Sequence, residues 1–326
     1  MSILLRKERI VMSSIVSKAF KGVKVLARTM RVNIKKKLTL PLWYGKRKEV
    51  KSWFFLYLCY SSFIIDVMVV LFGKSEWLRK AKIKVNYKNG LSLYFPFITG
   101  RYYSMMTNMM SNRYLHDFEK YYSRKVSLCD NDVVIDIGAN LGRFSIPIFF
   151  AHPRIRVFAY EPDPYNYACL QTSVRANRLD NSRFKINQLA VYDKKETVNF
   201  SASCTSTRSS IAAVNFPLSG TGTTSFSVET TTLNDIFEKN NLGTCKVLKI
   251  DCEGSEYKVL ETTPDTIFSR VENIILEIHT TEQRNPPMLI KFLENKGFDV
   301  KGEEYIRGIW EVYCVNRKTV HEKVYS

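Results

Sequence analysis

The chain has 326 residues, which is long enough for one large domain with an extension and for a sizeable buried core. Its net charge of +18 lies within residues 1–110, which hold 22 Lys/Arg and four acidic residues, whereas residues 111–326 are neutral. This distribution confines a polyanion partner to the N-terminal arm and disfavours nucleic acid as the substrate. Seven scattered cysteines without a Cys-x-x-Cys pair argue against a disulfide framework or a zinc site. With no secretory signal, they favour the cytoplasm.

Residues 1–81 are interpreted as a basic, partly hydrophobic extension. Apolar residues recur at helical spacing from 14 to 31 with Lys and Arg between them. This predicts a basic amphipathic helix that lies either on an anionic membrane surface or against its own protein. Residues 53–73 are the most hydrophobic window, but they contain Asp66 and have positive flanks on both sides. We therefore expect a buried or membrane-surface helix there rather than a spanning one, in a cytoplasmic protein with peripheral membrane contact.

Residues 82–316 are expected to form one α/β domain, followed by a tail at 317–326. The domain begins with two strand-like runs at 82–87 and 91–96, and the Lys-Asn-Gly between them predicts a hairpin. A tyrosine-rich helix is expected from about 101 to 123.

Strands and helices alternate from residue 133 onward, which implies a doubly wound, mostly parallel Rossmann-like sheet. The expected strands begin at Val133 and then cover Arg156–Tyr160, Arg183–Val191, Val247–Asp251, Asn273–His279, 298–305 and 309–315. The expected helices cover Phe144–Phe150, Pro164–Arg178, Ser255–Leu260 and Pro286–Lys296. Residues 192–232, rich in Ser and Thr, interrupt the alternation as a β-rich insertion.

The stretch Val-Val-Ile-Asp-Ile-Gly-Ala-Asn-Leu-Gly at 133–142 predicts a nucleotide-binding site. It joins a buried strand, a glycine turn where backbone can approach a ligand, and a helix start. Dinucleotide-binding folds use Gly-x-Gly-x-x-Gly, whereas here Gly138 and Gly142 are four residues apart and Asn140 stands between them. This looser turn, preceded by Asp136, resembles motif I of class I S-adenosylmethionine-dependent methyltransferases.

Acidic residues follow two of the predicted strands. Glu161 comes 19 residues after Gly142 at the end of a strand, where this architecture binds the two ribose hydroxyls of a nucleoside, although an exposed loop acid would look the same. Asp251 ends an apolar strand, so we expect it at the edge of the sheet where open α/β sheets bind ligands. Glu253 and Glu256 follow it, either as functional acids or as charges that complement a helix dipole.

A further apolar strand ends in Leu-Glu-Ile-His at 276–279. Glu277 is costly in a core strand unless it is paired or belongs to a site. His279 has a side-chain pKa near neutrality and is a candidate general base, or else a satisfied histidine at a strand end.

Five elements, in this order and spacing, resemble the FkbM family of methyltransferases over residues 83–316. They are Asp-Ile-Gly-Ala-Asn-Leu-Gly (136–142), Glu-Pro-Asp (161–163), Thr-Thr-Leu-Asn-Asp (231–235), Lys-Ile-Asp-Cys-Glu-Gly-Ser-Glu (249–256) and Leu-Glu-Ile-His (276–279). One departure is Asn234, where the family usually has Asp. We expect it to be structural, because Asn caps a helix as well as Asp does.

The resemblance implies a class I, Rossmann-like O-methyltransferase that uses S-adenosylmethionine and acts on a hydroxyl of a sugar, a glycan or another small molecule. It places the methionine half of the cofactor on the 136–142 turn and the ribose on Glu161. It also places adenine near Ala190 and the reacting sulfonium beside Asp251.

The hydroxyl proton must be removed during an in-line displacement, and we expect Asp251 or His279 to take it while Glu253 orients the acceptor. A divalent cation held by Asp251, Glu253 and Glu277 is an alternative way to activate the hydroxyl. Two other functions stay open at this point. One is a nicotinamide-dependent oxidoreductase, and the other is a membrane- or polyanion-binding protein with an inactive Rossmann-like domain.

Overall fold

The computed structural model describes residues 82–86, 90–96, 126–203, 209–211, 223–281, 284–306 and 308–318. Several predicted segments lie outside this part of the chain: the extension with its helices at 14–31 and 53–73, the helix at 101–123, the hairpin turn at 87–89 and most of the C-terminal tail. Within the described part, no helix is both long enough and apolar enough to cross a bilayer.

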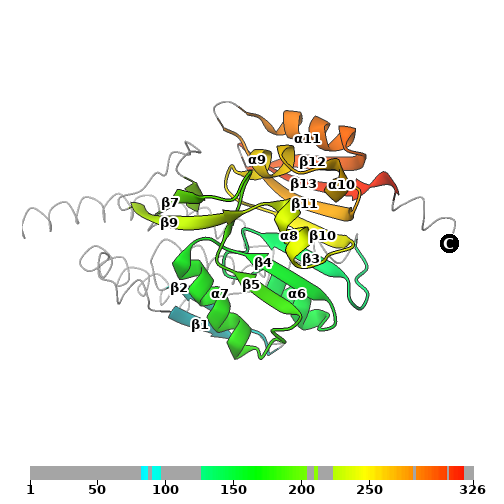
Figure 1. Cartoon of the computed structure of the whole chain (residues 1–326). Coiled ribbons are helices and arrows are strands. Elements are labelled where there is room, and N and C mark those ends of the chain that lie inside the picture. The colour runs from blue at the N-terminus through cyan, green and yellow to red at the C-terminus, as the bar shows by residue number, and fades with distance from the viewer. Residues whose placement is uncertain are drawn as a thin grey trace, which may run out of the picture. The chain divides into compact units, whose positions relative to one another are not determined.

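A seven-stranded sheet forms the centre of the domain, in the order β12-β13-β11-β10-β3-β4-β5 (Figure 1). Its strands are β3 (Val133–Ile137), β4 (Arg156–Tyr160), β5 (Phe184–Asn187), β10 (Cys245–Ile250), β11 (Val271–His279), β12 (Phe298–Ile306) and β13 (Ile309–Asn316). β3, β4, β5, β10 and β11 run parallel, and β13 is antiparallel to both of its neighbours. The strand order reverses between β3 and β10, so the predicted doubly wound, mostly parallel sheet is confirmed.

Helices cover both faces of this sheet (Figure 1). One face packs against α6 (Ser145–Ala151) and α7 (Pro164–Ala176). The other face packs against α8 (Leu233–Lys239), α9 (Glu256–Glu261), α10 (Asp265–Phe268) and α11 (Pro286–Asn295). Successive side chains of a strand point to opposite faces, so Val134 and Ile135 of β3 belong to different cores. The continuous apolar runs of the sequence follow from burial on both faces.

The predicted N-terminal hairpin is confirmed and belongs to this domain. β1 (Lys82–Asn86) pairs antiparallel with β2 (Ser92–Pro96), and Tyr94 N donates a 2.8 Å hydrogen bond to Ser173 Oγ on α7.

The β-rich insertion forms a second, four-stranded sheet in the order β6-β9-β7-β8. Its strands are β6 (Ala190–Val191), β7 (Thr197–Ser203), β8 (Ser209–Ile211) and β9 (Thr223–Thr231). The prediction of one strand over Arg183–Val191 is wrong. β5 ends at Asn187, and Ala190–Val191 pairs instead with Thr230 and Thr231 of β9. The chain therefore leaves the central sheet after Asn187 and joins the second sheet at Ala190.

The expected capping role of Asn234 is also wrong. Thr232 caps α8, because its Oγ1 accepts a hydrogen bond from Asp235 N while the Asp235 carboxylate accepts one from Thr232 N. Asn234 lies inside the first turn and donates to Glu238 Oε1. The departure from the family pattern therefore falls on a helix surface position.

Candidate active site

A cavity lies at the carboxyl ends of β3, β4, β10 and β11, where open α/β sheets bind ligands. Six of the nine predicted site residues line it: Gly138, Asn140, Glu161, Ala190, Asp251 and Glu253. The other three, Asp136, Gly142 and His279, are not among its lining residues. Glu277, predicted only as a ligand of the alternative divalent cation, also lines the cavity, as do Arg143 and Phe200, which the sequence did not single out.

The two glycines of the turn serve different purposes. Gly138 has φ +74°, and a Cβ built on it would lie 1.9 Å from the Asp251 carbonyl oxygen, so only glycine lets the turn approach the end of β10. Gly142 has φ +77°, and a Cβ there would lie 2.6 Å from side-chain atoms of Ile146 and Leu170. Gly138 therefore shapes the cavity wall, while Gly142 allows α6 and α7 to pack against the turn.

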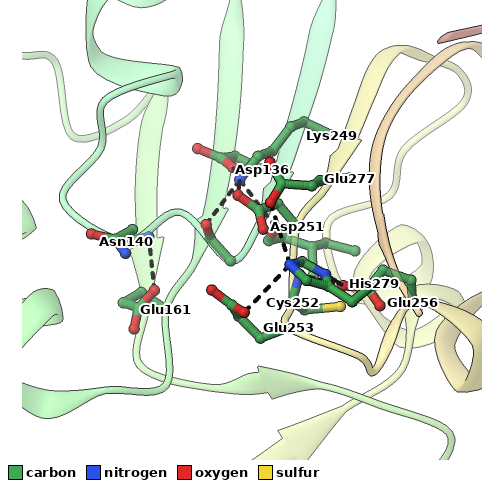
Figure 2. Close-up of polar contacts among 12 residues, drawn as sticks. Asp136, Asn140, Glu161, Lys249, Asp251, Cys252, Glu253, Glu256, Glu277 and His279 are labelled. Carbon is green, nitrogen blue, oxygen red and sulfur yellow. Dashed lines mark hydrogen bonds and ion pairs between the residues drawn. The ribbon is translucent and has the colours of Figure 1, made fainter. Parts of the chain in front are cut away.

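Glu161 is buried at the end of β4, where three groups donate hydrogen bonds to its carboxylate. Asn140 N lies 2.7 Å from Oε2 (Figure 2). Asp163 N and Asn166 Nδ2 donate to Oε1 at 2.9 and 3.4 Å. Burial and then the charge of Asp163 raise the pKa of Glu161 to about 7, although these hydrogen bonds oppose the shift. The hydrogen bond from Asn140 thus fixes the glycine turn and Glu161 relative to one another, and the pKa of Glu161 lies near neutral pH.

Asp136 is fully buried behind the cavity wall and faces Lys249, its neighbour across the β3–β10 pairing. Lys249 Nζ lies 3.2 Å from Asp136 Oδ1 and 3.5 Å from Asp251 Oδ2 (Figure 2). Burial lowers the pKa of Lys249, but the charges of Asp136 and Asp251 outweigh it and hold the pKa above its usual value. Lys249 is therefore a buried cation between the two acids.

His279 is enclosed by three carboxylates and is 1% exposed. Its Nδ1 lies 3.0 Å from Glu256 Oε1, and its Nε2 lies 3.3 Å from Glu277 Oε1 and 3.4 Å from Glu253 Oε2 (Figure 2). Burial lowers the pKa of His279, but the charge and hydrogen bond of Glu256, followed by the contacts of Glu277 and Glu253, raise it to about 12. These contacts favour the protonated form of the ring, which lies between the three acids.

Glu277 and Asp251 face the cavity side by side from neighbouring strand ends. The charge of Asp251, followed by burial, raises the pKa of Glu277 above its usual value. Ligand-type atoms of Asp251, Glu277 and His279 all lie within 4.8 Å of one another. The sequence signal for Glu277 was available: it is a carboxylate in an apolar strand, two residues before His279 and therefore on the same face.

A sequence model of the methyltransferase FkbM domain matches residues 136–300, just over half of the chain. The chain belongs to the FkbM methyltransferase family. The 31-O-demethyl-FK506 methyltransferase FkbM of Streptomyces tacrolimicus is 27% identical over 209 residues, which cover 56% of this chain and 79% of that protein. Methyltransferase sdnD of Sordaria araneosa is 24% identical over 204 residues, which cover 53% and 76%.

The chain is also similar to solved structures. Precorrin-6y C5,15-methyltransferase from Geobacter metallireducens GS-15 has 14% identity and a TM-score of 0.38, covering 62% of this chain and 87% of that one. TYW2 of M. jannaschii, solved with AdoMet, has 15% identity and a TM-score of 0.38, covering 72% and 84%. The FkbM-family membership identifies the chain as a methyltransferase and disfavours the nicotinamide-dependent alternative.

Proposed function

We propose that this FkbM-family chain transfers the methyl group of S-adenosylmethionine to a hydroxyl oxygen of a sugar, a glycan or lipid, or another small metabolite. The observation that carries the proposal is the position of Asp251, a carboxylate that lines the cavity directly beside the Gly138 turn. The Streptomyces relative is named for the methylation of 31-O-demethyl-FK506, which supports a hydroxyl acceptor on a small molecule here.

The residues of the cavity fit this cofactor. The turn has no space for a Cβ at Gly138, and Asn140 adopts a left-handed conformation with φ +53°. Both residues line the cavity. We assign this turn to the methionine half. Glu161 accepts only one hydrogen bond at Oε2 from the described residues, so it has acceptor capacity left for ribose hydroxyls. Ala190, with Phe200 beside it in the lining, provides an apolar surface for adenine.

When bound, S-adenosylmethionine supplies the electrophilic methyl group. Asp251, whose side chain is 32% exposed and lines the cavity, is assigned as the group that accepts the proton of the attacking hydroxyl. Glu253, also in the lining, orients the acceptor. His279 does not reach the cavity, so its assignment changes from a candidate base to a residue that positions Glu253 and Glu277.

The affinity for S-adenosylmethionine is expected to rise about tenfold between pH 6 and pH 8. Ribose hydroxyls donate to the ionised Glu161, so binding favours the charged form, and a carboxyl with a pKa of about 7 is mostly protonated at pH 6. Titration calorimetry of the full chain across this range measures the effect. Glu161→Gln is the matched variant, and it should bind more weakly without this pH dependence; an equal slope in both proteins would contradict the role of Glu161.

Chelators are expected to leave the methylation rate within about twofold of its initial value. Asp251 and Glu277 each already have a buried positive charge nearby, Lys249 at 3.5 Å and His279 at 3.3 Å, so a divalent cation is not needed to hold them together. The measurement is the rate with EDTA and after addition of Mg²⁺ or Mn²⁺. A loss of activity that these ions restore would instead favour a metal among Asp251, Glu277 and His279.

The proposed function is tested with S-adenosylmethionine labelled in its methyl group and a small-molecule extract of cells as the acceptor pool. Label is expected in an oxygen-linked methyl group of a hydroxylated product. If the chain instead binds S-adenosylmethionine and transfers no label, it is an inactive binding protein, and label on nitrogen or carbon would contradict O-methylation.

A further inference from the structure

The side chain of Lys249 contacts both the glycine turn and the cavity acid Asp251. It lies on β10, one residue before the end of the strand, and its Cα partner across the sheet is Asp136 on β3. Its side chain is 13% exposed and does not line the cavity. Lys249 therefore lies behind the wall that separates the sheet from the proposed cofactor site.

The ammonium group of Lys249 donates to backbone as well as facing carboxylates. Nζ donates a 2.9 Å hydrogen bond to the Gly138 carbonyl oxygen and lies 3.5 Å from that of Ile137 (Figure 2). It also lies 3.2 Å from Asp136 Oδ1 and 3.5 Å from Asp251 Oδ2. One cation thus contacts both carbonyls at the start of the turn, the buried acid and the cavity acid.

Neutralising Asp136 does not by itself account for this arrangement. A buried ion pair is often replaceable by apolar residues without loss of stability, because desolvation of both charges offsets their attraction. The contacts to Gly138 and Asp251 add something that an apolar pair would lack. They fix the distance between the turn that is assigned to cofactor binding and Asp251, which is assigned to accept the proton of the attacking hydroxyl.

We propose that Lys249 is a positioning residue that holds Asp251 at a fixed position relative to the glycine turn, as methyl transfer requires. The inference rests on the proposed function. An in-line displacement depends steeply on the alignment of donor and acceptor, so a small displacement of Asp251 relative to the turn lowers the rate more than it lowers cofactor affinity. Lys249 acts through these two elements and does not contact the reactants.

The test uses the full-length double variant Asp136→Asn/Lys249→Met, which removes both charges of the buried pair, beside the single variant Lys249→Met. The single variant leaves Asp136 buried without its cation, so its Tm should fall, and the double variant should recover most of that loss. The readouts are Tm, the affinity for S-adenosylmethionine by calorimetry, and the initial rate of label transfer into one fixed cell extract at saturating cofactor.

The double variant is expected to bind S-adenosylmethionine within about tenfold of the wild type and to transfer label about 100-fold more slowly. Recovery of the wild-type rate together with the Tm would overturn the proposal, because Lys249 would then only neutralise Asp136. If the double variant does not fold, Lys249→Arg decides: it keeps the charge but changes its shape and reach, and an unchanged rate would overturn the proposal. A wild-type chain that transfers no label would refute the proposed function instead.

Discussion

Replacing Asp251 with asparagine is expected to lower the rate of methyl transfer by about 100- to 10,000-fold, the usual contribution of a general base. The affinity for S-adenosylmethionine should stay within about threefold, because asparagine has the same shape and the 138–142 turn and Glu161 are unchanged. The measurement combines label transfer into the cell extract with calorimetric titration of the cofactor. A loss of rate without a loss of binding would mark Asp251 as acting in the chemical step.

The control for this variant is Asp299→Asn, which removes a carboxylate that is 65% exposed on β12 and remote from the cavity. It should leave both the rate and the affinity unchanged. A rate within threefold of the wild type in Asp251→Asn would contradict the assignment. Glu277, the other carboxylate beside Asp251 in the lining, would then be the next group to test as the proton acceptor.

Replacing Gly138 with alanine is expected to abolish measurable binding of S-adenosylmethionine and to lower the Tm. The added Cβ would lie 1.9 Å from the Asp251 carbonyl oxygen, so the turn and the end of β10 must move apart. The positive φ of +74° adds a conformational penalty of about 1 kcal/mol. Both effects displace the cavity wall, so the cofactor site and the position of Asp251 are lost together.

Gly243→Ala provides the matched control, because a Cβ at Gly243 would meet nothing within 4 Å and its φ is not in the left-handed region. That variant should bind the cofactor like the wild type. If Gly138→Ala kept wild-type affinity and Tm, the close approach of the turn to β10 would not be needed for the site.

Much of the fold was predictable because its strands are buried on both faces. Val133–Ile137 and Arg156–Tyr160 are short apolar runs bounded by turn residues, and such runs are typical of strands in the core of a parallel sheet. The position of the acids Glu161 and Asp251 at the ligand-binding edge could also be predicted. Each directly follows such a strand, and the carboxyl ends of parallel strands meet at one edge.

The network behind the cavity was not predictable, because it depends on the pairing of strands that are remote in sequence. Lys249 faces Asp136 only through the register between β10 and β3. The sequence left His279 open between a candidate general base and a satisfied histidine at a strand end. Glu253, in the loop before α9, and Glu256, the first residue of α9, both lie against its ring. Strand order and register carry this information, and neither can be derived from local periodicity.

The N-terminal prediction concerns a different part of the molecule. The basic excess of the chain lies in residues 1–110, and the amphipathic and hydrophobic segments at 14–31 and 53–73 fall outside the described residues. Contact of this extension with an anionic membrane surface stays a prediction, independent of the site at the carboxyl edge of the sheet.

The central claim is that the cavity beside Gly138 binds S-adenosylmethionine with Glu161 on the ribose. Calorimetric titration of S-adenosylmethionine into the full-length wild type and Glu161→Gln tests it directly. We predict one saturable site per chain in the wild type and an affinity at least about tenfold weaker in the variant, the cost of losing hydrogen bonds to a charged group. No saturable heat with the wild type, or equal affinity in the two proteins, would contradict the claim.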